Sequence, residues 1–167
     1  FQARLEPEKP RPREHARIIL DLKIHHGWHV FSVIPGEGDF APIPTTLTFE
    51  DESLLLIGPV YESNPITAPD PVLDMVLSFH EKQVSLFQNI QIPQEMSGGT
   101  AWKNSGNLSY QACSDRVCLP PKTDRFSIEI QLGTGETRSE YKIPQFAVDN
   151  PPEDISELED ALKGGFW

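Results

Sequence analysis

The chain has 167 residues, a length at which one domain usually buries a sufficient hydrophobic core, so folding should not depend on disulfide staples. Its formal net charge of -11 repels the phosphates of nucleic acids and anionic lipid headgroups, and we therefore expect no nucleic-acid partner. No apolar run approaches the roughly 18 residues that cross a bilayer, and residues 1–12 lack the apolar core of a signal peptide. We therefore expect a soluble, processed fragment.

Alternation of apolar and polar residues predicts a half-buried strand near the N-terminus, from Ala16 to Ile24. After Gly27, the residues Trp28–Phe31 have high β-propensity and predict a second strand. Turn signals separate four further β-rich segments, which are Thr45–Phe49, Val84–Ile92, Asn107–Ala112 and Phe126–Leu132. Several short strands without a helical period between them predict an all-β fold, a β-sandwich.

The segment from Glu62 to Asp74 contains three prolines, Pro65, Pro69 and Pro71, and has no clear periodicity. This pattern predicts a long loop. Long loops within compact domains are often functional.

The composition changes after Leu132, where a polar connector leads into an acidic tail. We therefore expect a folded domain over residues 12–135 and an acidic linker over residues 136–167. The Asn-Pro-Pro-Glu run that begins at Asn150 combines a helix cap with prolines tolerated in a first helical turn. Apolar residues at helical spacing follow it and predict a short amphipathic helix, either packed on the sandwich or leading to a further domain: Ile155, Leu158 and Leu162.

The two cysteines, Cys113 and Cys118, are five positions apart, so an extended chain would separate their Cα atoms by about 17 Å. A disulfide needs Cα atoms within roughly 7 Å, and the chain between them must therefore double back if they bond. Ser114, Asp115 and Arg116 suit a turn, and a tight loop between neighbouring strands would bring the sulfurs together.

Three chemical roles are open to this cysteine pair. A static disulfide in a non-enzymatic exported binding domain is one, but a loop this short stabilises by only about 2 kcal/mol in the chain-entropy model. A metal-binding domain is another, because thiolates with His25, His26 and His29 can bind zinc or copper, although the cysteine spacing is wider than in zinc knuckles. Thiol–disulfide exchange is favoured, because a partner thiolate can reach sulfurs in a short loop. Exchange needs no cofactor, and we expect no metal site.

The run from Tyr110 to Thr123 carries a specific combination, Tyr-Gln-x-Cys, a second cysteine and x-Pro-Pro-x-Thr. It resembles the active-site segment of the N-terminal periplasmic domain of the thiol:disulfide interchange protein DsbD family. The resemblance extends to Gly27–Phe31 and to the strand from Val84 to Ile92, and so covers about residues 12–135.

This resemblance implies an immunoglobulin-like β-sandwich in the bacterial periplasm, within a membrane-anchored parent protein. It implies a protein-disulfide reductase that takes electrons from a thioredoxin-like domain of the same protein. The electrons then pass to oxidised periplasmic proteins such as disulfide isomerases, and the same electron transport serves cytochrome c biogenesis in the family.

The resemblance also implies roles for single residues. Cys113 and Cys118 match the redox pair, with Cys118 as the sulfur that bonds the partner. His29 and Phe31 match aromatic positions that pack against the pair. A loop that caps the disulfide matches the region of Asp70, Val72 and Leu73, and further residues near the site are Tyr110, Asp115 and Arg116.

The sequence departs from the family pattern in three ways. Four residues rather than five separate the cysteines, His29 stands where tyrosine is usual, and the cap region has no aromatic residue. The shorter spacing is also similar to that of relatives linked to metal-stress tolerance. Next to Cys118, Pro120 and Pro121 lack backbone N–H groups, which predicts an open strand edge there.

Overall fold

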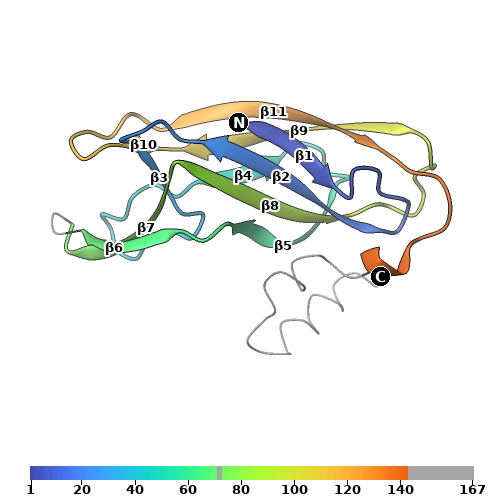
Figure 1. Ribbon diagram of the computed structural model, residues 1–167, viewed down its shortest axis with the longest axis horizontal. Helices are drawn as coiled ribbons and strands as arrows, with labels where there is room; N and C mark the ends of the chain where they lie inside the picture. Colours follow the sequence, from blue (N-terminus) through green and yellow to red (C-terminus); the bar gives the residue numbers. More distant parts are fainter. Residues whose placement is uncertain (71–72, 143–167) are drawn as a thin grey trace.

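The computed structural model describes residues 1–70 and 73–142 and forms eleven β-strands there, arranged in three antiparallel sheets (Figure 1). The β2 sheet has the order β1 (Gln2–Glu6), β2 (His15–Lys23), β8 (Gln83–Gln91), β5 (Leu55–Glu62). The β3 sheet has the order β10 (Ala112–Cys113), β3 (His29–Phe31), β7 (Met75–Glu81), β6 (Ile66–Asp70). The β9 sheet has the order β11 (Lys122–Gln131), β9 (Ala101–Tyr110), β4 (Thr46–Phe49), and a short 3-10 helix, η1 (Ser139–Tyr141), follows β11.

The main hydrophobic core lies between the β2 sheet and the β9 sheet. Buried residues alternate with more exposed ones along β9 and β11, as the period of a β-strand requires. Fully buried aliphatic residues from both sheets meet there, among them Ile18, Leu20, Leu86, Leu108 and Ile130. Two antiparallel sheets that enclose one core make an immunoglobulin-like β-sandwich, which confirms the predicted fold class.

Each of the six segments predicted as strands overlaps one, namely β2, β3, β4, β8, β9 and β11. β9 begins at Ala101 rather than at Asn107, because Trp102, Asn104 and Gly106 continue the register with β11. The sequence patterns missed β1, β5, β6, β7 and, as a separate strand, the two-residue β10. β1 precedes residue 12 and pairs with β2 from Gln2 to Glu6, so the β2 sheet extends ahead of the expected start of the domain.

The prediction of one long loop from Glu62 to Asp74 is wrong. β6 occupies Ile66–Asp70 and pairs with β7 along its whole length. Pro69 is compatible with a strand here because β6 is the edge of its sheet, and an edge position need not donate a ladder hydrogen bond. Val72 lies outside the described residues.

A buried carboxylate fixes the connector that follows β11. Glu14 has no exposed surface, and its carboxylate accepts hydrogen bonds from the backbone N–H groups of Arg11 at 2.9 Å and Arg138 at 2.8 Å. The Arg138 guanidinium donates two more, at 2.7 and 2.9 Å. Burial would raise the pKa of Glu14, but the hydrogen bonds from Arg138 and Arg11 outweigh it and lower that pKa.

The predicted amphipathic helix lies in residues 143–167, outside the described residues, and stays a prediction. Within residues 1–70 and 73–142, no helix has the length and apolar character that crossing a bilayer requires.

Glu14→Gln should lower the free energy of unfolding by about 3 kcal/mol at pH 7, because it leaves the Arg138 guanidinium without its buried partner charge. The pKa of Glu14 is lowered in the folded state, so its contribution is complete above the ordinary value of 4.5 and is lost as the pH falls through the folded value. Urea unfolding at several pH values measures both effects. Glu8→Gln, at an exposed position of the same segment, is the control. Equal stabilities of E14Q and E8Q at pH 7 would contradict a stabilising role of the Glu14–Arg138 interaction.

Candidate functional site

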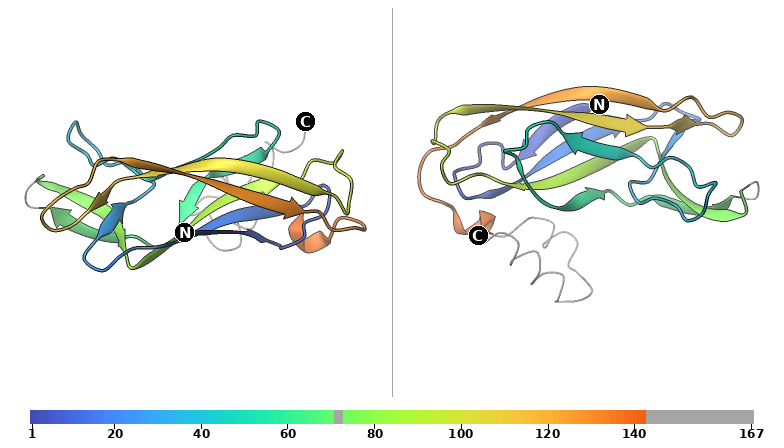
Figure 2. Two further views of the ribbon diagram at one scale, coloured as in Figure 1. Left: turned by 90° about the horizontal axis from the view of Figure 1, so that it is seen from above. Right: turned by 180° about the vertical axis from the view of Figure 1, so that it is seen from behind.

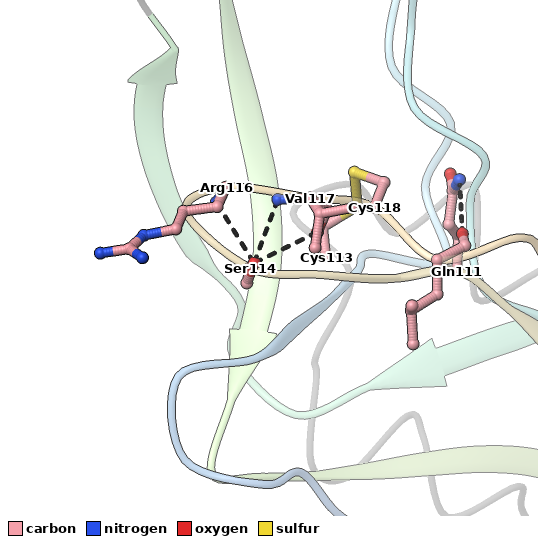
Figure 3. Close-up of a disulfide and its surroundings, with 7 residues drawn as sticks. Gln111, Cys113, Ser114, Arg116, Val117 and Cys118 are labelled. Atoms are coloured by element: carbon pink, nitrogen blue, oxygen red, sulfur yellow. Dashed lines mark hydrogen bonds between the residues drawn. A yellow bond between two sulfur atoms is a disulfide. The ribbon is translucent and has the colours of Figure 1, made fainter.

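The two cysteines face each other across a tight hairpin and form a disulfide, with their Cα atoms 4.0 Å apart (Figure 3). The Leu119 N–H donates to the Ala112 carbonyl at 2.9 Å on one side of the pair, and the Ser114 N–H donates to the Val117 carbonyl at 2.8 Å on the other. The cysteines therefore occupy the narrow position of an antiparallel ladder, where opposing side chains are closest. The chain between Cys113 and Cys118 doubles back, as a disulfide between them requires.

Side chains of the hairpin brace this turn. The Ser114 hydroxyl accepts hydrogen bonds from the backbone N–H groups of Arg116 at 3.2 Å and Val117 at 3.1 Å. The Gln111 amide donates to the Leu119 carbonyl at 3.1 Å. None of these bonds uses a sulfur atom, so we expect them to persist when the disulfide is reduced.

The two cysteines differ sharply in burial. Cys113 is 2 % exposed and packs in a second hydrophobic cluster, whereas Cys118 is exposed. The cluster around Cys113 joins residues of β3 and β7: Phe31, Met75, Leu77 and Phe79. Only one sulfur-bearing residue of the pair is therefore open to another protein.

His29 and Phe31 lie beside the buried cysteine. Cys113 is directly opposite His29 in the β10–β3 register, so both side chains project from the same face. The His29 ring lies 5.3 Å from the Phe31 ring and 5.1 Å from the Phe79 ring. Burial lowers the pKa of His29, and the negative charges of Glu81 and Asp70 oppose that shift in part.

Asp70 and Leu73, two of the residues expected near a cap, lie at the end of the β6–β7 hairpin. Asp70 ends β6, and its carboxylate accepts a hydrogen bond from the Leu73 N–H at 3.0 Å. Leu73 is 37 % exposed, and Cys118 is exposed as well. Shielding of the disulfide by Asp70, Val72 and Leu73 therefore stays a prediction.

The other three candidates have different surroundings. The Tyr110 hydroxyl donates to Asp124 at 2.9 Å and its ring packs against the main core, while burial and Asp124 raise the pKa of Tyr110. Asp115 and Arg116 are exposed in the turn. The Arg116 side chain points away from the disulfide (Figure 3).

The sequence patterns did not identify β7, whose apolar side chains pack in the cluster around Cys113. Met75, Leu77 and Phe79 alternate with Val76, Ser78 and His80, so a period-2 signal was available in that segment. β7 pairs with β3, and this pairing places the apolar side chains of β7 against Cys113, which is distant in the sequence.

A second missed feature is a buried polar network behind the site. The Glu62 carboxylate accepts hydrogen bonds from His80 Nε2 at 2.7 Å, from the Val33 N–H at 3.0 Å and from the Ser32 hydroxyl. Burial would raise the pKa of Glu62, but these hydrogen bonds outweigh it and lower that pKa. Because Glu62 ends β5, the network fastens the β3 sheet to the β2 sheet.

The histidines considered as metal ligands are spread over the turn before β3. His25 and His26 are exposed there, whereas His29 lies among the aromatic rings. The described residues contain no group of three or more His, Cys, Asp or Glu side chains that could hold a metal ion.

Comparison with known proteins gives one family and two solved structures of interest. The family model described as thiol:disulfide interchange protein DsbD, N-terminal, matches residues 2–130. A search of curated sequences found no match. The reduced Neisseria meningitidis DsbD N-terminal domain is similar at 14 % identity and a TM-score of 0.45, over 77 % of this chain and 90 % of that one. The N-terminal periplasmic domain of ScsB from Proteus mirabilis is similar at 14 % identity and a TM-score of 0.46, over 93 % of this chain and 50 % of that one.

Reduction should leave the fold intact, because the hairpin hydrogen bonds and the main core do not involve the sulfurs. Thermal unfolding of the oxidised and reduced forms should both be cooperative, with the reduced form less stable by about 2 kcal/mol and its midpoint lower by about 4–8 °C. A variant with both Cys113→Ser and Cys118→Ser should match the reduced protein. Loss of cooperative unfolding on reduction would instead identify a structural staple.

His29→Tyr should change how disulfide reduction depends on pH. The pKa of His29 is lowered, so the imidazolium that favours a leaving Cys113 thiolate forms only below the ordinary value of 6.5. The ratio of wild-type to H29Y rates, measured with a water-soluble phosphine, should therefore rise as the pH falls through that region. His26→Tyr, at an exposed position, should leave the profile unchanged, and a constant ratio for H29Y would separate His29 from the chemistry.

Proposed function

As this chain belongs to the family of the DsbD N-terminal domain, we propose that it passes electrons between proteins through the Cys113–Cys118 disulfide. Its role in thiol–disulfide exchange follows from the family, and the proposal adds the direction and the roles of the two sulfurs. The observation that carries it is the unequal burial of two bonded cysteines in a hairpin whose hydrogen bonds use no sulfur atom.

The first half-reaction reduces the domain. A partner thiolate attacks Cys118 Sγ, the Cys113–Cys118 bond breaks, and Cys113 leaves with the electron pair and takes up a proton. A second partner thiol then attacks the partner sulfur of the mixed disulfide and releases Cys118. Two electrons and two protons have moved to the domain, and the partner has become a disulfide.

The second half-reaction returns the domain to the oxidised form. The Cys118 thiolate attacks a disulfide of an oxidised substrate, and one substrate sulfur leaves as a thiol. Cys113 then attacks Cys118 Sγ, which restores the internal disulfide and frees the second substrate sulfur. The substrate gains the two electrons that the domain carried.

Surface exposure supports Cys118 as the sulfur that meets the partner. The residues that follow it, Leu119, Pro120 and Pro121, are exposed and belong to no strand. Neither proline has an N–H to donate, so this edge is open to an incoming chain. Cys113 is enclosed by Phe31 and Leu77, which suits a resolving thiol.

The position of His29 supports a role in supplying a proton or a positive charge to the Cys113 sulfur when it leaves the disulfide. An apolar cluster disfavours a free thiolate, so the leaving sulfur needs a proton or a nearby positive charge. His29 is the titratable side chain directly opposite Cys113 in the ladder. We assign it a positioning and proton-holding role.

The family also supports the proposed partners and location. A thioredoxin-like domain of the same parent protein would donate electrons, and periplasmic disulfide isomerases or other thioredoxin-fold proteins would accept them. The domain would act in the bacterial periplasm, with residues 136–167 linking it to a membrane-anchored part of the parent. The connection that includes Asp70, Val72 and Leu73 would shield the disulfide until a partner docks.

Trapping of mixed disulfides tests the assignment of roles. The probe is a thioredoxin variant that lacks its resolving cysteine and carries thionitrobenzoate on the remaining one, so attack by a thiolate releases a coloured thiol. Cys113→Ser, which keeps the exposed sulfur, should form the adduct at least about tenfold faster than Cys118→Ser, because exchange rates follow access to sulfur.

Equal rates for the two variants would remove the assignment of Cys118 while leaving the pair redox-active. Adduct formation by neither folded variant, with a disulfide that resists dithiothreitol in the native protein, would instead favour a static disulfide in a binding domain.

A further inference from the structure

A pocket of about 570 Å³ lies beside β7, next to the connection that joins β3 to β4. Figure 2 shows this connection running alongside the β6–β7 hairpin in both views. The pocket volume falls in the range of ligand sites, which is roughly 300–1,000 Å³. Apolar residues from both segments form part of its wall: Phe31, Ile34, Pro42, Pro44, Met75 and Leu77.

One edge of β7 is open toward this pocket. β3 pairs with β7 only from Phe79 to Glu81, and the Ser32 N–H adds one bond to the Ser78 carbonyl. In the part of the chain that the structure describes, no strand pairs with Met75–Leu77 on that side.

The backbone of Val76 points to the open edge. Val76 lies opposite Pro69, which has no N–H, so these two residues form a pair without ladder hydrogen bonds. The N–H and C=O of Val76 must then point to the other side of β7. Ser78 lies two residues further along β7, so its backbone groups point to the same side as those of Val76. The Ser78 carbonyl accepts a hydrogen bond from Ser32 on the β3 side, which independently gives this direction.

The pocket is continuous with the surroundings of the disulfide. Phe31 and Leu77 line the pocket and also pack in the cluster that contains Cys113. A chain lying in the pocket would therefore be held beside the cysteine hairpin. This continuity links the pocket to the partner that the proposed function requires.

Charge adds a further preference. Glu37 and Asp74 line the pocket, no lysine or arginine does, and neither acid forms an ion pair within the described residues. The net charge of the whole chain is -11. A basic residue on an incoming chain would therefore be attracted to this rim.

We propose that an extended segment of the exchange partner docks here as an added strand. Its backbone bonds the N–H and C=O of Val76, one of its apolar side chains enters the pocket, and a lysine or arginine lies near Glu37 and Asp74. The identity of the occupant as an exchange partner rests on the proposed function, whereas the pocket's affinity for such a segment does not.

Titration of the isotope-labelled protein with a short peptide tests the docking site directly. The peptide alternates valine and threonine, carries one lysine near its end and is blocked at both termini. The amide resonances of Met75, Val76 and Leu77 should shift with saturation. Methylation of the central backbone nitrogen of the peptide should weaken binding about tenfold without any change to the protein.

Two protein variants complete this test. Val76→Pro removes the N–H that faces the pocket, and Ile34→Asp places a charge on its wall; both positions are well exposed, at 65 % and 71 %. Each should weaken peptide binding about tenfold, whereas Val76→Thr keeps the N–H and should bind like the wild type. Absence of saturable shifts at β7, or equal binding by V76P and V76T, would overturn the docking site.

Exchange kinetics separate this inference from the proposed function. With reduced thioredoxin as the probe, V76P and I34D should exchange about tenfold more slowly than the wild type, while dithiothreitol should reduce all of them at one rate. A wild-type protein that exchanges with neither reductant would refute the proposed function, yet the peptide titration would still decide the docking site. Unchanged thioredoxin rates in V76P and I34D would refute docking of the exchange partner.

Discussion

Two backbone hydrogen bonds on either side of the cysteines are the constraint on which the site depends. The Ala112–Leu119 and Ser114–Val117 bonds hold Cys113 and Cys118 opposite each other at the closest spacing that a β-ladder offers. Neither hydrogen bond uses a sulfur atom. We therefore expect the disulfide to open and close while the domain around it keeps its fold.

The fold gives the two cysteines unequal burial. β10 is a strand of two residues at the edge of the β3 sheet, so one cysteine lies against β3 and β7 while the other lies beyond the edge. The aromatic and aliphatic side chains of Phe31, Leu77 and Phe79 cover the inner cysteine. The Glu62 hydrogen bonds to His80 and to Val33, which follows β3, link this covering layer to β5 of the β2 sheet.

Local patterns in the sequence were sufficient for the strands with regular alternation and for the folding back of the cysteine loop. They failed at β6, where proline suggested a loop, because the cost of a missing N–H depends on whether a strand lies at an edge. The resemblance placed His29 near the pair, and the register of β10 with β3 shows how they meet. The exposure of Cys118, the pocket beside β7 and the buried Glu14 depend on contacts between distant segments, which no local pattern contains.

The hydrogen bonds between Glu14 and Arg138 fix the place where the described chain leaves the sandwich. η1 lies at one end of the long axis, and the cysteine hairpin next to β10 lies at the other (Figure 1). The described part of the chain therefore ends remote from the sulfurs. Under the proposed function, an electron donor that follows in the same polypeptide would have to reach from that end along the sandwich to the cysteine hairpin.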